Sequence, residues 1–147
     1  MKKVFFDTNV LLDSVLPNRE NSEEASVVLS ASDNGLIEGC VSFLSVANSA
    51  YILKKGRTTY QMKEILKDVL AGIKVLPMND SQLEAAYDID APDFEDVLQY
   101  ECAKSAGCDI IITSNSKHFK FIKDIEVVTT LDFAAQFTED SFSKGNK

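Results

Sequence analysis

The chain has 147 residues, of which 45% are hydrophobic and 26% charged, and these values are typical of one globular domain that needs no disulfide or structural metal. Its formal net charge of −8 argues against broad, non-specific nucleic-acid binding, which relies on a basic surface, but is compatible with an acidic cluster that holds divalent cations. No stretch is long and apolar enough to cross a membrane, and Asp7 interrupts the first apolar run too early for a signal peptide.

The cysteines point to a reducing compartment. The chain has an odd number of cysteines, namely Cys40, Cys102 and Cys108. They lack the spacing of a zinc site and lie in or beside apolar stretches. We therefore expect buried free thiols and a cytoplasmic protein that does not contact a membrane.

Strands and helices alternate along the chain. The first half predicts a strand at Val4–Phe6, a helical segment at Asn9–Val15, a helix at Ser22–Ser32, a strand at Ile37–Val41 and a helix at Phe43–Lys55. The second half predicts a helix at Thr59–Ala71, a strand at Ile73–Leu76, helices at Asp80–Tyr87 and Phe94–Ala106, a strand at Asp109–Thr113, a short helix at Lys117–Ile122, a strand at Ile125–Val128 and a helix at Leu131–Phe137. This order predicts an α/β domain built around a mostly parallel sheet.

Two segments have a distinctive composition. The helix at Phe43–Lys55 is apolar on most sides, so we expect it to be buried. Residues 138–147 are polar and charged, and we expect a flexible tail there, which leaves residues 1–137 as the domain.

Polar side chains occur where the predicted strands end and the helices begin. Asp7 follows the first strand, Thr113 ends another strand, Ser42 opens one helix and the segment Asp93–Asp96 opens a second. In a parallel α/β sheet these positions meet at one edge, where ligands bind. The carboxylates there are candidate metal ligands or catalytic groups.

Local structural roles are an alternative for each of these acids. Asp7 is also suited to capping the helix that follows it, and Asp93 and Asp96 have the spacing of a capping box. Capping explains one acid of the segment Asp93–Asp96, but it does not explain why three of its four residues are acids.

Three further polar residues have two interpretations. Asn115 either caps the next helix or belongs to the site. Asn48 lies nearly two turns into an apolar helix, where its amide needs a partner, either in the core or in the site. His118, the only histidine, follows a lysine in an expected surface segment, and we do not expect it to bind a metal alone.

Three segments resemble the PIN domain family. They are Phe6-Asp7-Thr8-Asn9-Val10-Leu11-Leu12, Asp93-Phe94-Glu95-Asp96-Val97-Leu98-Gln99-Tyr100, and the weaker Asp109-Ile110-Ile111-Ile112-Thr113-Ser114-Asn115-Ser116-Lys117-His118-Phe119. The resemblance covers residues 1–137 and implies a three-layer α/β/α PIN-like domain with a central, mostly parallel sheet. It also implies a nuclease whose acidic cluster binds Mg²⁺ or Mn²⁺, and many such proteins are VapC-type toxin ribonucleases.

The resemblance assigns roles to individual residues. Asp7 and Asp96 would be the metal ligands, and Asp93 an auxiliary acid. Asn9, Ser42 and Thr113 would orient ligands or water. Asn48 and Asn115 stand where many members of the family have acids, and His118 where some have an aspartate, so the set of carboxylates is reduced.

The expected function is that of a metal-dependent endoribonuclease, a hydrolase of RNA phosphodiesters, as the toxin of a toxin–antitoxin pair. The implied partners are the RNA substrate, an antitoxin protein and a second copy in a homodimer, with an interface near Tyr51 or in the helix near Tyr60–Leu70. The alternative is a catalytically reduced PIN fold that binds a protein or RNA without cleavage. A haloacid-dehalogenase-type phosphohydrolase would need a second aspartate where this chain has Asn9.

Overall fold

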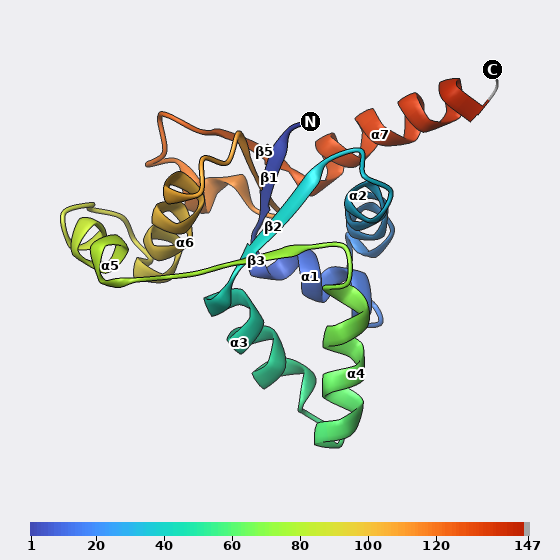
Figure 1. The fold of residues 1–147 in the computed structure, drawn as a ribbon, viewed down its shortest axis with the longest axis horizontal. Coiled ribbons are helices and arrows are strands. Elements are labelled where there is room, and N and C mark those ends of the chain that lie inside the picture. Colours follow the sequence, from blue (N-terminus) through green and yellow to red (C-terminus); the bar gives the residue numbers. More distant parts are fainter. Residues whose placement is uncertain (146–147) are drawn as a thin grey trace.

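A five-stranded parallel sheet forms the centre of the molecule, with the strand order β3-β2-β1-β4-β5 (Figure 1). The computed structural model describes the backbone of residues 1–145 and the side chains of residues 1–137. The strands are β1 (Lys3–Phe6), β2 (Glu38–Ser42), β3 (Lys74–Leu76), β4 (Ile110–Thr113) and β5 (Glu126–Thr129). All four neighbouring pairs are parallel, which confirms the predicted sheet.

The helices follow the predicted order. They are α1 (Thr8–Val15), α2 (Ser22–Asp33), α3 (Phe43–Leu53), α4 (Thr59–Val69), α5 (Asp80–Tyr87), α6 (Phe94–Ser105) and α7 (Thr130–Gly145). The short helix predicted at Lys117–Ile122 is a single 3₁₀ turn, η1 (Ser116–Phe119). The last helix runs beyond its predicted end at Phe137 to Gly145. The expected tail therefore overlaps this helix, and its residues 146–147 and the side chains of residues 138–145 lie outside the described part of the chain.

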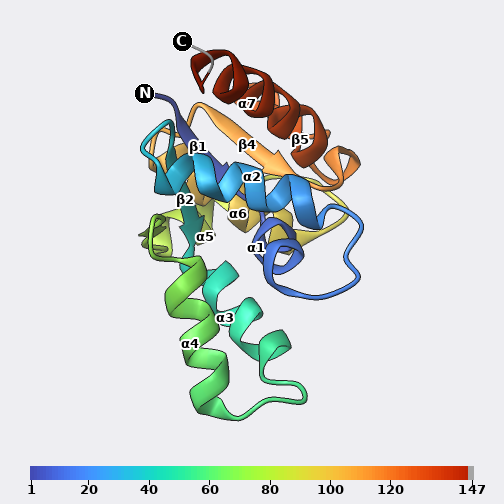
Figure 2. The same ribbon diagram turned by 90° about the vertical axis from the view of Figure 1, so that its right-hand side faces the viewer.

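The sheet separates two apolar cores, because successive side chains of a strand point to opposite faces. On β1, Val4 and Phe6 pack on one face with α1, α2 and the start of α7, whereas Phe5 packs on the other with residues of α6. Figure 2 shows α2 and α7 side by side over the first face, and Figure 1 places α5 and α6 on the opposite side. This is the three-layer α/β/α arrangement that the resemblance implied.

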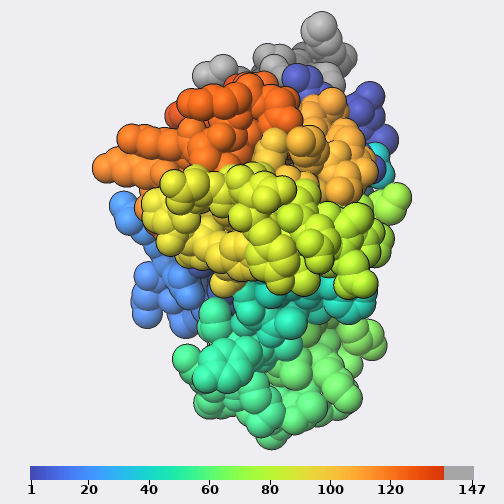
Figure 3. Space-filling model, turned by 90° about the vertical axis from the view of Figure 1, so that its left-hand side faces the viewer, coloured from blue at the N-terminus to red at the C-terminus, as the bar shows by residue number. Residues whose placement is uncertain are grey.

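Helices α3 and α4 extend from one end of the sheet (Figures 1 and 2), and α5 lies next to them on the face shown in Figure 3. The prediction that α3 is buried was wrong. Its buried side chains are Ser45, Ser49 and Leu53, whereas Phe43 and Tyr51 are 63% and 72% exposed. The reason is that Ser45 on the buried face of α3 bonds to Thr8 on α1 and Gln99 on α6, so Phe43 and Tyr51 on its other faces point outward.

Two expectations based on composition agree with the structure. Cys40, Cys102 and Cys108 are free and buried, as predicted. Among the described residues, none of the helices combines the length and apolar character needed to span a membrane.

Candidate functional site

Asp7 is held at the carboxyl end of β1 by three hydrogen bonds. Its backbone N–H donates to the carbonyl of Ile112 (2.9 Å), which extends the β1–β4 pairing by one residue. Its Oδ1 accepts from the N–H of Thr8 (2.9 Å), and its Oδ2 accepts from the hydroxyl of Thr113 (2.9 Å). Asp7 therefore caps α1, and Thr113 orients its carboxylate from the neighbouring strand.

Asp93 and Asp96 lie at the start of α6 and differ in their surroundings. Asp93 is exposed and caps the helix, since its Oδ1 accepts from the N–H of Glu95 (2.9 Å). Asp96 is 8% exposed, and its Oδ2 is buried without a hydrogen-bond partner among the described atoms. Capping thus accounts for Asp93 and leaves Asp96 with an unsatisfied carboxylate oxygen, which is costly unless another group or ion contacts it.

The structure brings four acids into one electrostatic cluster. Burial, followed by the charges of Asp93 and Asp7, raises the pKa of Asp96 to about 6. Burial also raises the pKa of Asp7, against the hydrogen bonds from Thr113 and Thr8. Glu95 is the fourth acid, and its pKa is raised by burial and by Asp93 and Asp7. These groups repel one another when ionised, so they favour a cation between them.

The partner of Asn48 is Glu95. The Asn48 amide donates to Glu95 Oε1 (2.6 Å) and is only half-buried, so it lies at the border of the acidic cluster rather than in the core. Glu95 is one of the three acids within four residues at the start of α6, but no individual role was predicted for it. Its position two residues after Asp93, in the first turn of the same helix, was the available signal.

The loop after β4 adds Asn115 and His118 to the site. Asn115 caps η1, since its Oδ1 accepts from the N–H of Lys117 (3.2 Å), and its amide nitrogen lies 3.2 Å from His118 Nε2. His118 is exposed, as expected, but its Nδ1 lies 3.7 Å from Asp96 Oδ2. Its proximity to Asp96 was not predicted, because it depends on how η1 packs against the start of α6.

Two expected supporting residues do not contact the carboxylates. Ser42 is fully buried, caps α3 by accepting from the N–H of Ser45 (3.0 Å) and donates to Gln99 Oε1. Asn9 is exposed on the first turn of α1. Gln99 was not predicted as a site residue, although its spacing of three residues from Asp96 places both on one face of α6.

The residues present fit a hard divalent cation that keeps part of its water shell. Among the described side chains, no group of three or more His, Cys, Asp or Glu could hold a metal ion. Mg²⁺ commonly binds through one or two carboxylates and retains several waters, so a larger protein cage is not required. Asp96 Oδ2, which accepts no hydrogen bond from the described atoms, and the oriented carboxylate of Asp7 are suitable ligands of this kind.

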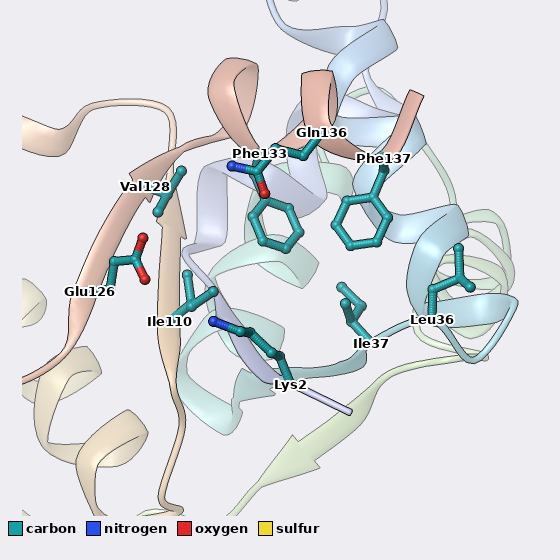
Figure 4. A pocket seen from close by; sticks show the side chains of 9 residues that line it. All are labelled: Lys2, Leu36, Ile37, Ile110, Glu126, Val128, Phe133, Gln136 and Phe137. Carbon is teal, nitrogen blue, oxygen red and sulfur yellow. The ribbon is translucent and has the colours of Figure 1, made fainter. Parts of the chain in front are cut away.

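A small cavity lies at the opposite end of the sheet (Figure 4). Its volume is about 180 Å³, and Ile110, Phe133 and Phe137 form part of its apolar wall, with Lys2 and Glu126 also lining it. Because Lys2 precedes β1 and Ile110 and Glu126 begin their strands, the cavity lies at the amino ends of the strands, away from the acids.

The fold and the site define a class of protein: a three-layer α/β/α domain with an acidic cluster at the carboxyl ends of its parallel strands. The sequence matches the PIN domain family over residues 3–117. The chain therefore belongs to the PIN domain family, as the resemblance indicated.

Relatives of known name support this assignment. The chain is 32% identical over 144 residues to Ribonuclease VapC1 of Aquifex aeolicus, covering 92% of this chain and 96% of the relative. The fold is similar to VapBC-1 from nontypeable Haemophilus influenzae, with a TM-score of 0.64, 17% identity, and coverage of 88% of this chain and 98% of that one. It is also similar to the sarcin-ricin loop cleaving toxin VapC20 of Mycobacterium tuberculosis, with a TM-score of 0.62, 11% identity, and coverage of 81% and 96%.

Proposed function

We propose that this protein is a metal-dependent endoribonuclease that hydrolyses RNA phosphodiesters at the acidic cluster. The observation that carries the proposal is a set of two buried carboxylates: Asp7 is oriented by Thr113, and Asp96 has a buried oxygen without a hydrogen-bond partner among the described atoms. The relative named Ribonuclease VapC1 supports the reaction class.

Asp7 and Asp96 would hold Mg²⁺ or Mn²⁺, with Asp93 and Glu95 adding negative charge at the site. When bound, the metal would activate a water molecule and stabilise the charge that develops on the phosphate. Thr113 and the N–H of Thr8 keep the Asp7 carboxylate in a fixed orientation, so it needs little rearrangement on binding. His118 lies on the exposed side of Asp96, where the substrate would enter.

A PIN domain that binds RNA or protein without cleavage is the second candidate. Asn48 and Asn115 favour it, because they contribute amides where acids would add ligand charge, and fewer carboxylates bind a cation more weakly. The cleavage experiment below separates the two candidates.

We also propose that the protein is the toxin of a toxin–antitoxin pair and acts in the cytoplasm. VapBC-1 of Haemophilus influenzae and a toxin–antitoxin complex from Klebsiella pneumoniae share its fold. An antitoxin that covers the acidic cluster would block the substrate. The three buried free thiols fit a reducing compartment.

We propose a homodimer that forms through α3. Phe43 and Tyr51 are 63% and 72% exposed on this helix, and large exposed apolar side chains that lie close together mark interaction surfaces. The alternative interface is the helix α4, on which Tyr60 is also 72% exposed.

The test is cleavage of a mixed RNA pool with Mn²⁺, with Mg²⁺ and with EDTA. We expect the wild type to cleave only with a divalent cation and the double variant Asp7→Asn/Asp96→Asn to be inactive. Asp80→Asn, at an exposed acid in the first turn of α5, is the matched control and should cleave normally. If the folded wild type neither cleaves RNA nor takes up Mn²⁺, the nuclease proposal is wrong, and the second candidate, a PIN domain that binds RNA or protein without cleavage, is favoured. Equal cleavage by wild type and double variant would reveal a contaminating nuclease and would equally remove the support for this site.

A further inference from the structure

We propose that Gln99 is a positioning residue of the acidic site: its buried amide fixes the helix that carries Asp96 against the strand end that carries Asp7. The inference rests on the metal-dependent nuclease function proposed above. It assigns a role to a residue that does not itself touch substrate or metal.

Gln99 is fully buried on α6 and forms hydrogen bonds with side chains of α1, of α3 and of the last residue of β2. Its Nε2 donates to Thr8 Oγ1 (3.1 Å) on α1 and to Ser45 Oγ (2.7 Å) on α3. Its Oε1 accepts from the hydroxyl of Ser42 (2.5 Å) at the start of α3. Both amide hydrogens and the carbonyl oxygen of this side chain are therefore satisfied within the protein.

The hydroxyl groups around Gln99 are also linked to one another. Thr8 Oγ1 and Ser45 Oγ lie 2.7 Å apart, and Ser42 Oγ accepts from the N–H of Ser45 (3.0 Å). Thr8, Ser42 and Ser45 are each 9% exposed or less, so water does not readily replace a lost partner. A buried network whose members are all paired is rigid.

The network connects directly to both proposed metal ligands. Thr8 follows Asp7 in the chain, and its N–H donates to Asp7 Oδ1 (2.9 Å). Gln99 lies three residues after Asp96, on the same face of the helix. A continuous path of covalent and hydrogen bonds thus runs from Asp7 through Thr8 and Gln99 to Asp96.

This connection explains the polar face of α3. Ser45 and Ser49 are buried on α3 while Phe43 and Tyr51 are exposed, and a buried hydroxyl group costs stability unless it has a hydrogen-bond partner. Ser49 Oγ has no such partner among the described atoms. Gln99 supplies the partner for Ser45. The contact between Gln99 and Ser45 therefore belongs to the network that reaches the Asp7 carboxylate through Thr8, and loss of this network would change the spacing of the two proposed metal ligands.

The test measures three properties of each variant: Mn²⁺ binding by calorimetry, thermal unfolding and RNA cleavage. Gln99→Met keeps the shape of the side chain and removes its hydrogen bonds. Gln82→Met is the matched control, because Gln82 is 4% exposed and lies on α5, and among the described residues its side chain bonds only to the backbone of Asn79 and Pro77. Thr8→Val and Thr8→Ser form a second pair, in which only the serine keeps the hydroxyl.

We expect both glutamine variants to unfold at lower temperature than the wild type. Gln99→Met and Thr8→Val should raise the Kd for Mn²⁺ about tenfold or more, the usual effect of losing a group that orients metal ligands. They should lower kcat more than they change KM for RNA, while Gln82→Met and Thr8→Ser stay within about twofold of the wild type in Kd.

Three outcomes would overturn the inference. The first is a Gln99→Met protein that loses stability but binds Mn²⁺ as the wild type does, which would make Gln99 a structural residue only. The second is an equal loss in Thr8→Ser and Thr8→Val, a comparison that also decides the question if Gln99→Met does not fold. The third is a wild type that neither binds Mn²⁺ nor cleaves RNA, which removes the proposed function itself and is distinct from the other two.

Discussion

The hydroxyl of Thr113 donates a 2.9 Å hydrogen bond to Asp7 Oδ2, although the two residues lie 106 positions apart in the chain. The register of β1 and β4 explains the contact. Phe6 pairs with Ile112, so the residues that follow them, Asp7 and Thr113, lie side by side at the carboxyl ends of the two strands. The bond lowers the pKa of Asp7, against burial, which raises it. Thr113 therefore favours the ionised form of Asp7 that a cation requires.

Replacing Thr113 by valine should weaken Mn²⁺ binding about tenfold, because Asp7 loses the hydroxyl that orients its carboxylate. Thr113→Ser keeps the hydroxyl and should bind Mn²⁺ nearly as well as the wild type. Titration calorimetry at pH 7 measures both. Equal affinities for the valine and serine variants would show that the hydrogen bond does not matter for the metal.

Replacing Asp96 by asparagine should stabilise the metal-free protein at neutral pH. The pKa of Asp96 rises from 3.8 to about 6 in the folded state, mainly through burial, so folding favours the protonated acid. This stabilisation is complete below about pH 4 and is lost as the pH rises through 6. Asparagine resembles the protonated acid. In EDTA, the free energy of unfolding of Asp96→Asn should therefore exceed that of the wild type by an amount that increases above pH 4 and reaches about 1–2 kcal/mol at pH 7, allowing for solvent screening.

Thermal unfolding in EDTA across this range measures the effect, with Asp80→Asn as the exposed control. If the stability of Asp96→Asn relative to the wild type does not change with pH, or if the variant is less stable than the wild type at pH 7, the pKa of Asp96 is not raised in the folded state.

Replacing His118 by glutamine should move Mn²⁺ binding to higher pH. The charge of His118, whose Nδ1 lies 3.7 Å from Asp96 Oδ2, lowers the pKa of Asp96. Without it, Asp96 must lose its proton at a higher pH before it binds a cation. Mn²⁺ affinity measured from pH 5 to 8 tests this. The expectation fails if the profile of His118→Gln matches that of the wild type or moves to lower pH.

Replacing Tyr51 by glutamate should convert the proposed dimer to a monomer. The side chain is 72% exposed, so the change should alter the stability of the fold by no more than about 0.5 kcal/mol. A charge placed in an apolar interface is strongly unfavourable. Light scattering coupled to size-exclusion chromatography measures the mass. Tyr60→Glu on α4 should remain dimeric, and a monomer from Tyr60→Glu alone would move the interface from α3 to α4.

The order of strands and helices was predictable from the sequence because it depends on local patterns. The apolar run at Val4–Phe6 and the alternation of elements are visible within a few residues, and the structure has each predicted strand. The same holds for the residues that open helices. Asp7, Ser42 and Asp93 were recognised where a strand ends or a helix starts, and each caps the helix that follows.

Contacts between distant segments were not predictable, because no local pattern records them. Composition predicted a buried α3, yet its large side chains Phe43 and Tyr51 are exposed, and its buried Ser45 bonds to Gln99, 54 positions away. Likewise, the contact between Asn48 and Glu95 depends on how α3 meets α6. The sequence by itself thus determined the elements, their order and the acids at the sheet edge, whereas tertiary packing decided which polar side chains hold those acids in place.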